Sequence, residues 1–317
     1  MNINDITALG LWPESKKTTS QKGIKELEDL GYNLFYIGKN ADLYTCPGDE
    51  AKVLLVRSDR CSVFDIPLNL EIEGKGVSQT AISNSGAAFA REAGIRTAIL
   101  AENVDSSLDI ADRCQMMELC KPLEAEIDGE VVQFEFIFRN YLTGSLFDAC
   151  QNGSDPYGLN LSSDLEQWHK FETPLFTPTT KGVKDIPLNA QKVRDVFPEI
   201  IESLEKLFKD FTVFAEDNGI IIVDTKFEAF VNSNGEWVLG DEVLTPESSR
   251  FIAKKDFGNG NFISMDKQIL RDFGKKENWK EQAKDLAAGQ KLEVDVPDSI
   301  KNTILDGYST IHNSLSK

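Results

Sequence analysis

Acidic and basic side chains alternate along one stretch, and their spacing suggests chemistry on an anionic substrate. Asp224, Lys226 and Glu228 follow an apolar, β-branched run that predicts a strand. Side chains alternate between the two faces of a strand, so these three should share one face. Asn234-Gly235 then predicts a two-residue hairpin turn, which would place Glu228 opposite Asp241 on the returning strand.

Two carboxylates opposed on one sheet face repel each other unless a positive charge lies between them. Lys226 could supply that charge in a structural salt-bridge cluster. Alternatively, Glu228 and Asp241 hold a divalent cation, because carboxylate oxygens beside a lysine suit Mg²⁺ and phosphate. The pattern alone leaves both interpretations open.

Composition excludes several function classes. The 317 residues carry a net charge of −18, which disfavours nucleic acid or an anionic membrane surface as a partner. Basic residues should therefore be concentrated in any site for an anionic substrate. The five cysteines show no CxxC spacing, and no signal peptide or membrane-spanning run is visible, so we expect reduced thiols and a cytoplasmic location. A homo-oligomer remains open. Neither His169 nor His312 lies in a catalytic or zinc motif, which leaves carboxylates, lysine, arginine and metal.

Three sequence blocks occur in a fixed order between about Tyr36 and Phe251. They are 58–65 continued by 73–76, then 135–145, and finally 219–230 together with 240–251. These blocks resemble the SAICAR synthetase (phosphoribosylaminoimidazole-succinocarboxamide synthase) family, and long motifs in the right order are a specific signal. The resemblance implies an ATP-dependent carbon–nitrogen ligase of purine biosynthesis. Such an enzyme joins L-aspartate to carboxyaminoimidazole ribotide (CAIR) through an acyl phosphate, giving SAICAR, ADP and phosphate.

The resemblance also implies an α+β fold of two lobes with ATP in the cleft between them. The first lobe would be an antiparallel, sheet-rich lobe over 1–121, and the second a larger α/β lobe over 122–317. The local patterns agree. Strands are expected over 32–39, 41–46, 52–57, 96–101 and 133–139. Helices are expected over 20–30, over 79–92 with Ser78 as N-cap, and in two tail segments, 279–286 and 298–315, that pack on the second lobe. A long amphipathic helix is expected from Val193 to before Gly219, with its apolar stripe in the core and either a new start or a bend at Pro198.

Site residues are carried over from the family motifs as expectations. The catalytic residues would be Lys226, Arg139 and Asp224, the last orienting Lys226. The ATP contacts would be Gly38, Lys39, Lys121, Glu135 and Lys226. The ribotide contacts would be Arg139, Ser145, Asp241 and Arg250. The metal ligands for Mg²⁺ would be Glu228 and Asp241, and a loop would contribute Lys181 and Asp185.

The sequence departs from the family pattern at two positions. Ala41 stands where a second basic phosphate contact is usual, and Lys184 replaces the histidine of a His-Asp pair. The loop at 74–76 before a helix is also a possible anion site, although a plain helix start is commoner. Two rival functions remain: a small-molecule kinase on a related scaffold, which would need no aspartate, and a non-catalytic nucleotide-binding paralogue, which Ala41 and Lys184 make conceivable. ATP turnover with and without aspartate and ribotide separates them.

Overall fold

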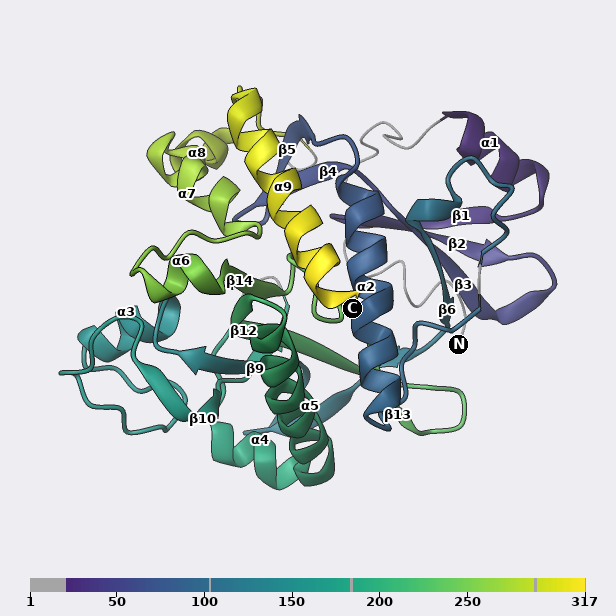
Figure 1. The fold of residues 1–317 in the computed structure, drawn as a ribbon. Coiled ribbons are helices and arrows are strands. Elements are labelled where there is room, and N and C mark those ends of the chain that lie inside the picture. Colours follow the sequence, from purple (N-terminus) through teal and green to yellow (C-terminus); the bar gives the residue numbers. More distant parts are fainter. Residues whose placement is uncertain (1–20, 103, 183–184, 288–289, 317) are drawn as a thin grey trace. The chain divides into compact units, whose positions relative to one another are not determined.

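The computed structural model describes residues 21–102, 104–182, 185–287 and 290–316 of the chain (Figure 1). The chain forms two compact units of mixed α and β structure. Unit 1 comprises Met1–Ala88, Ala98–Leu119 and Ser264–Lys317, and unit 2 comprises Phe89–Thr97 and Cys120–Ile263. These limits differ from the predicted lobes mainly at the C-terminus, because the tail groups with unit 1 and not with the second lobe.

An antiparallel sheet in unit 1 has the order β1-β2-β3-β6, with bounds Asn33–Ile37, Ala41–Cys46, Asp49–Arg57 and Cys114–Glu118. The three strands expected from the sequence are confirmed. Helix α1 (Gln21–Asp29) precedes them and is followed by Gly31 at φ 90°, the left-handed conformation that commonly ends helices. One core cluster here consists of Leu27, Tyr44, Leu54, Val56, Leu108, Ile110 and Cys114.

A second group of elements in unit 1 surrounds the hairpin of β4 (Arg60–Val63) and β5 (Ile66–Glu71). Helix α7 (Gln268–Lys276) contacts β4, and it also contacts α8 (Trp279–Gln282) and α9 (Asp298–Leu315). Both tail helices expected from the sequence are present, with a short 3₁₀ turn, η3 (Ala283–Asp285), after α8. Another 3₁₀ turn, η2 (Ala111–Arg113), leads into β6.

Helix α2 (Lys75–Glu92) begins before the predicted N-cap at Ser78, so that prediction is wrong. The Asp59 carboxylate accepts a hydrogen bond from the Gly76 N–H at 2.9 Å. It therefore occupies the position where an anion would bind at this helix N-terminus. A side chain at Gly76 would meet the Arg57 carbonyl oxygen at 2.9 Å, which explains the glycine.

The strand predicted over 96–101 is also wrong. Thr97 and Ile99 form only isolated bridges, to Leu239 and Met117 respectively. The chain passes from unit 2 to unit 1 between residues 97 and 98, so no single partner strand runs beside the whole segment.

Unit 2 is built on a sheet whose two long antiparallel strands are β9 (Glu130–Tyr141) and β12 (Ile220–Val231). Strands β8 (Glu124–Ile127), β10 (Lys170–Phe176) and β11 (Thr179–Lys181) pair with β9. Strands β7 (Lys121–Pro122), β13 (Trp237–Gly240) and β14 (Ser249–Ala253) pair with β12. In the register of the central pair, Asp224 lies opposite Arg139 and Lys226 opposite Ile137.

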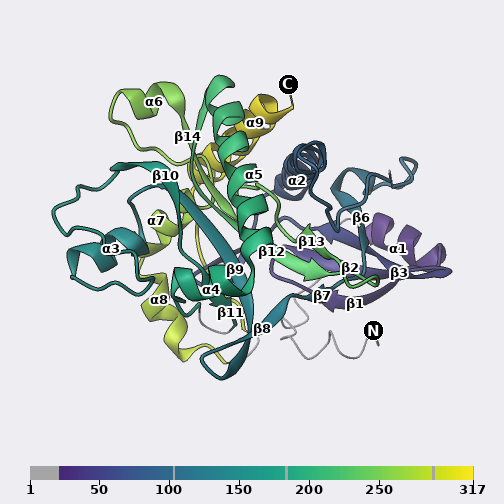
Figure 2. The ribbon, with the colours of Figure 1, turned by 90° about the horizontal axis from the view of Figure 1, so that it is seen from below.

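Helix α5 (Pro198–Asp217) covers the sheet of unit 2 and runs beside β12 (Figures 1 and 2). Pro198 occupies its first turn after α4 (Ala190–Val196), so the helix starts anew there, which is one of the two expected alternatives. The other helices of the unit are α3 (Ser145–Gln151) and α6 (Lys254–Gly258). Among the described helices of either unit, none is long and apolar enough to cross a membrane.

The hairpin between β12 and β13 differs from the prediction by one residue. Asn232 pairs with Glu236, and the loop is the three residues 233–235, with Gly235 at φ 80°. The Asn232 side-chain oxygen accepts the N–H groups of Asn234 and Glu236, both at 3.0 Å, and this stabilises the longer loop. Glu228 therefore lies opposite Gly240, and the predicted pairing with Asp241 is wrong.

Candidate active site

The two faces of the β9–β12 pair have different chemistry. Asp224, Lys226 and Glu228 share one face, as predicted, and contact Arg139 and Glu135 on β9. The opposite face is aromatic and packs against α5, with fully buried rings whose centroids lie 5.1–6.2 Å apart: Phe136, Phe138, Phe176, Phe208 and Phe227. Because these rings are packed in the core, they fix the two strands and therefore the position of the polar face.

Two arginines bind the same carboxylate at one end of the polar face. Arg139 Nη1 donates to Asp224 Oδ2 at 2.7 Å, and Arg250 Nε donates to Oδ1 at 2.9 Å. Thr177 Oγ1 accepts from Arg139 Nε at 3.0 Å, and the hydroxyl of buried Tyr157 lies within hydrogen-bonding reach of Arg139. Two guanidinium groups against one carboxylate leave a net charge of +1, which suits an anion such as phosphate.

A glycine turn brings the start of α3 beside these arginines. Gly144 adopts φ 60° and ψ −141°, and a Cβ there would lie 3.2 Å from Arg250 Nη1. Ser145 follows directly as the first residue of α3. The structure thus gathers three of the four residues expected to contact the ribotide, Arg139, Ser145 and Arg250, into one cluster.

The expected role of Asp224 as the residue that orients Lys226 is wrong. Asp224 lies directly opposite Arg139 and binds the arginines, whereas Lys226 lies opposite Ile137 and reaches the diagonal neighbour Glu135. Lys226 Nζ donates to Glu135 Oε1 at 2.7 Å and to Glu228 Oε1 at 2.8 Å. Glu135 is fixed in turn by Thr179 Oγ1, which donates to Oε2 at 2.7 Å. Glu135 and Glu228 orient Lys226.

Glu228 and Asp241 influence each other electrostatically despite the shifted register. Asp241 follows the last residue of β13 and has a left-handed backbone, φ 56°. Burial, and then the charge of Glu228, raise the pKa of Asp241 to about 7. Burial alone would also raise the pKa of Glu228, but the ammonium groups of Lys226 and Lys181 outweigh it and hold this pKa below its usual value.

This carboxylate pair has the donor chemistry for a divalent cation. In the described part of the chain, no group of three or more acidic, histidine or cysteine side chains could hold a metal. Mg²⁺ usually takes only one or two carboxylates and completes its shell with water and substrate phosphates, so Glu228 and Asp241 suffice. The raised pKa of Asp241 also indicates that a nearby positive charge would favour its ionised form.

The predicted ATP contacts Gly38 and Lys39 lie at the β1–β2 turn of unit 1. A side chain at Gly38 would meet the Ala41 carbonyl oxygen at 2.8 Å, so the turn requires glycine. Arg60 holds the turn, because its Nη2 donates to the Gly38 oxygen at 2.9 Å and to Asp42 at 2.6 Å. The Asp59-Arg60 pair thus has structural partners, and the exposed Lys39 forms an ion pair with Asp65.

Of three further positions that the sequence singled out, two are exposed and one lies outside the described residues. Lys121 is exposed on β7 opposite Val231. Asp185 is exposed. Burial raises the pKa of Tyr157, and the negative charge of Asp185 also acts to raise it, so Asp185 lies near Tyr157 and the arginine cluster. Lys184 lies outside the described residues.

Sequence reasoning missed two cations of unit 1, Lys267 and Arg271. Together with Lys39, their charges hold the pKa of Asp65 below its ordinary value, although burial opposes the shift. Lys267 lies directly before α7 and Arg271 lies within it, four residues later, which is a detectable helical spacing. No local pattern links α7 to the β4–β5 hairpin about 200 residues earlier, however.

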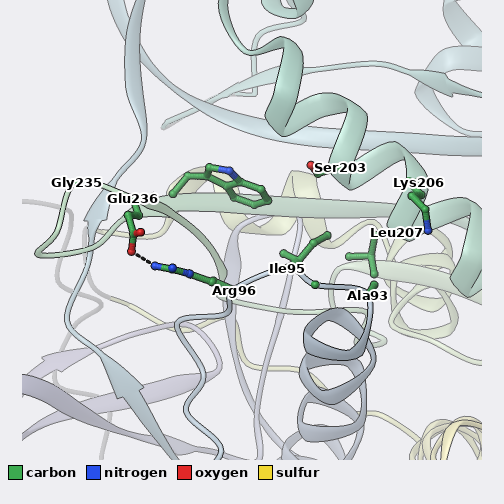
Figure 3. Close-up of a pocket in the computed structure, with 10 residues that line it drawn as sticks. Ala93, Ile95, Arg96, Ser203, Lys206, Leu207, Gly235 and Glu236 are labelled. Carbon is green, nitrogen blue, oxygen red and sulfur yellow. Dashed lines mark ion pairs between the residues drawn. The ribbon is translucent and has the colours of Figure 1, made fainter.

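A separate pocket of about 510 Å³ lies between α5 and the β12–β13 hairpin (Figure 3). Ser203 and Leu207 of α5 line it together with Trp237, whose alternation with Val238 places it on the aromatic face of the sheet. Its charged groups are neutralised locally, since Arg96 pairs with Glu236 and Lys206 with Asp210. This pocket is therefore not part of the ionic cluster on the opposite face.

Comparisons with known proteins agree with this architecture. The family model described as SAICAR synthetase matches residues 34–286. The phosphoribosylaminoimidazole-succinocarboxamide synthase of Histophilus somni is 33% identical over 304 residues, covering 92% of this chain and 100% of the relative. That of Actinobacillus succinogenes is 34% identical over 266 residues, covering 81% and 91%.

Solved structures give the same result. The SAICAR synthase of Saccharomyces cerevisiae, solved in complex with SAICAR, superimposes with a TM-score of 0.70 at 25% identity, covering 95% of this chain and 97% of that one. A type-2 SAICAR synthetase in complex with ADP has a TM-score of 0.59 at 24% identity, covering 83% and 100%, and supports the fold alone. The chain therefore belongs to the SAICAR synthetase family.

Proposed function

We propose that this chain joins L-aspartate to CAIR through an acyl phosphate, with the roles of its residues divided along the polar face of β9 and β12. As a member of its family the chain is an ATP-dependent ligase of purine biosynthesis. The observation that supports the division is that one face carries two clusters of different charge. The arginine cluster consists of Arg139, Arg250 and Asp224 and has a net charge of +1. The lysine cluster has two ammonium groups and three carboxylates, those of Lys181, Lys226, Glu135, Glu228 and Asp241.

The arginine cluster binds the phosphate of the ribotide. Arg139 and Arg250 present planar guanidinium groups that suit bidentate contact with phosphate oxygens, and Asp224 fixes both. The Gly144 turn leaves room for this contact, because a side chain at that position would press on Arg250. Ser145 adds a hydroxyl at the first turn of α3.

The lysine cluster faces the reacting groups. Arg139 and Glu135 are four residues apart on β9, about 13 Å along the strand, so a ribotide anchored at the arginines can extend toward Lys226. Its carboxylate attacks the γ-phosphorus of ATP, the bond to the bridging oxygen breaks, and ADP leaves. Lys226, held by Glu135 and Glu228, stabilises the negative charge on the transferring phosphoryl oxygens.

The aspartate amine then attacks the acyl carbon, loses a proton and expels inorganic phosphate, which forms the amide. Glu228 and Asp241 would hold Mg²⁺, which when bound neutralises phosphate charge. Lys39, on the β1–β2 turn, would contact the ATP phosphates. No disulfide joins the described cysteines, in keeping with the cytoplasmic location that we propose.

The experiment is ADP release by the purified chain, measured with ATP and with CAIR and L-aspartate added singly or together. We expect ADP and SAICAR in equal amounts, and only when all three substrates are present. A small-molecule kinase would release ADP without aspartate, and a non-catalytic paralogue would bind nucleotide without turnover; either result would contradict the proposal.

A further inference from the structure

A buried ion pair lies beneath the turn between β1 and β2 in unit 1. Arg60 binds the Asp42 carboxylate through both of its Nη atoms, at 2.6 and 3.2 Å, and its Nη2 also donates to the Gly38 oxygen at 2.9 Å. Arg60 is 5% exposed and Asp42 3%. A buried ion pair is seldom more stabilising than apolar side chains of similar volume, so stability alone does not explain this pair.

The turn above the ion pair is not closed by its own backbone. Two-residue hairpin turns usually need a positive φ at one or both central residues, but none of residues 38–41, all of which the structure describes, has one. The Gly38 N–H donates to the Ala41 oxygen at 2.8 Å. The return bond from the Ala41 N–H to the Gly38 oxygen is not formed in this described segment, and Arg60 binds that oxygen instead.

The contact with Arg60 also sets the direction of a backbone donor. The peptide that joins Gly38 to Lys39 is trans, so its N–H points opposite to its oxygen. Because Arg60 binds the oxygen, the Lys39 N–H is directed away from the buried ion pair. Lys39 thus combines this backbone donor with the ammonium group that we propose for the ATP phosphates.

Ser58 fixes the direction of a second backbone donor in the turn. The Asn40 oxygen accepts from the Ser58 N–H at 2.8 Å and from Ser58 Oγ at 2.9 Å. The N–H and C=O groups of successive strand residues point to alternate edges, so the Ala41 N–H faces away from β3 and into the turn. Backbone N–H groups gathered in a turn form a concave site that attracts an anion.

We propose that Arg60 is a positioning residue for the phosphates of ATP. By binding the Gly38 oxygen, it leaves the Ala41 N–H to a phosphate oxygen. The Lys39 N–H, directed away from the ion pair, is the second backbone donor. Asp42 neutralises Arg60, so Arg60 contributes geometry and not net charge.

This role explains how the chain functions with alanine at position 41, where a second basic side chain is usual. A backbone N–H binds a phosphate oxygen without any side-chain charge, provided that no carbonyl of the turn competes for it. The inference rests on the proposed function and deepens it, because it concerns the turn that we propose meets ATP.

The test measures nucleotide binding by calorimetry in EDTA, so that no metal contributes to phosphate binding. Arg60→Lys keeps the positive charge beside Asp42, but a single ammonium group cannot replace the planar fork that binds the carboxylate and the Gly38 oxygen together. We expect the Kd of ADP to rise about tenfold or more in this variant. Adenosine has the same base and ribose but no phosphate, so its Kd should change by less than about twofold.

Arg113→Lys is the matched control. Arg113 also binds a carboxylate, that of Asp59, and a backbone oxygen, that of Arg57. Its Kd values for ADP and adenosine should stay within about twofold of the wild type. Equal losses of affinity for both ligands in Arg60→Lys would show general damage to unit 1 and overturn the proposal, as would an unchanged Kd for ADP.

Arg60→Met combined with Asp42→Asn gives the same comparison if Arg60→Lys does not fold. The double variant removes both charges, so no unpaired charge is left buried, and it should fold. We expect the same selective loss of ADP affinity, because the Gly38 oxygen again lacks its arginine. A double variant that binds ADP as tightly as the wild type would refute the role of Arg60.

Ala41→Arg in two backgrounds tests the link to the missing basic residue. In Arg60→Lys the added arginine replaces the lost backbone donor and should lower the Kd of ADP about fivefold, whereas in the wild type it should lower it by less than about twofold. Equal effects in the two backgrounds would contradict the proposal, because they would mean that positions 41 and 60 act independently.

Binding and turnover measured side by side keep this inference distinguishable from the proposed function. If Arg60→Lys loses affinity for ADP selectively, the inference stands even when no SAICAR forms and the proposed function fails. If SAICAR forms but Arg60→Lys binds ADP as the wild type does, the inference is wrong and the proposed function survives.

Discussion

Two isosteric substitutions in the carboxylate pair should change the stability of the metal-free protein in opposite directions. Asp241 has its pKa raised from 3.8 to about 7 in the folded chain, so stability falls as the pH rises from 3.8 to about 7, and the full loss is present above that range. The shift corresponds to at most about 4 kcal/mol, and partial contact with water reduces this, so we expect Asp241→Asn to add about 1–2 kcal/mol at pH 8. This gain should shrink toward pH 5, where folded Asp241 is protonated.

Glu228→Gln should lower the stability of the metal-free protein at pH 8. The folded-state pKa of Glu228 is depressed by Lys226 and Lys181, so its contribution is present above pH 5 and is lost on acidification. The substitution leaves two lysines without their shared partner and should lower the melting temperature at pH 8.

The assay is thermal unfolding in EDTA from pH 5 to pH 8, followed by circular dichroism. Asp195→Asn, an exposed carboxylate on α4, is the control and should show neither effect. If Asp241→Asn and Glu228→Gln lowered the melting temperature equally, or if the gain from Asp241→Asn did not depend on pH, the two carboxylates would not interact as described.

Three further predictions concern ligand contacts and a turn. Arg139→Ala should raise KM for CAIR by the loss of a charge-assisted contact, about 1.5–3 kcal/mol or at least tenfold, with KM for ATP nearly unchanged; a loss of ATP affinity alone would refute the arginine assignment. Ala41→Arg should leave turnover roughly unchanged or lower KM for ATP modestly, whereas rescue of an inactive wild type would support a non-catalytic paralogue. Gly38→Ala should cost about 1–3 kcal/mol in chemical unfolding, because its Cβ would lie 2.8 Å from the Ala41 oxygen; an unchanged midpoint would show that the turn can relax.

Local periodicity sufficed to predict much of the fold. The alternation of Asp224, Lys226 and Glu228 gave the correct face of β12, and the apolar stripe of α5 was correctly expected in the core. The predicted hairpin register was wrong because the Asn232 side chain accepts hydrogen bonds from two backbone N–H groups. These bonds stabilise a loop that is one residue longer. Such competition between side chain and backbone is invisible to a pattern based on Asn-Gly alone.

Partners of charged residues were harder to predict than their positions. Asp224 was expected to orient Lys226, with which it shares a strand face. The residue directly opposite Asp224 on β9 is Arg139, however, and Asp224 binds Arg139 instead. Lys267 and Arg271 were missed because their link to Asp65 depends on packing of α7 on β4, which no local spacing encodes. Contacts between distant segments are set by tertiary structure.

The three clusters explain how a chain with a net charge of −18 can serve anionic substrates. Each places more than one cation around a single buried or strained carboxylate: Asp224 between two arginines, Glu228 between two lysines, and Asp65 beside Lys39 and the cations of α7. The carboxylate holds the cations in place without a ligand and limits their mutual repulsion. At the arginine cluster a substrate anion then meets a fixed excess of positive charge, and less side-chain ordering remains to oppose binding. Removing one such carboxylate should therefore loosen its cations, so we expect it to weaken anion binding although it removes negative charge.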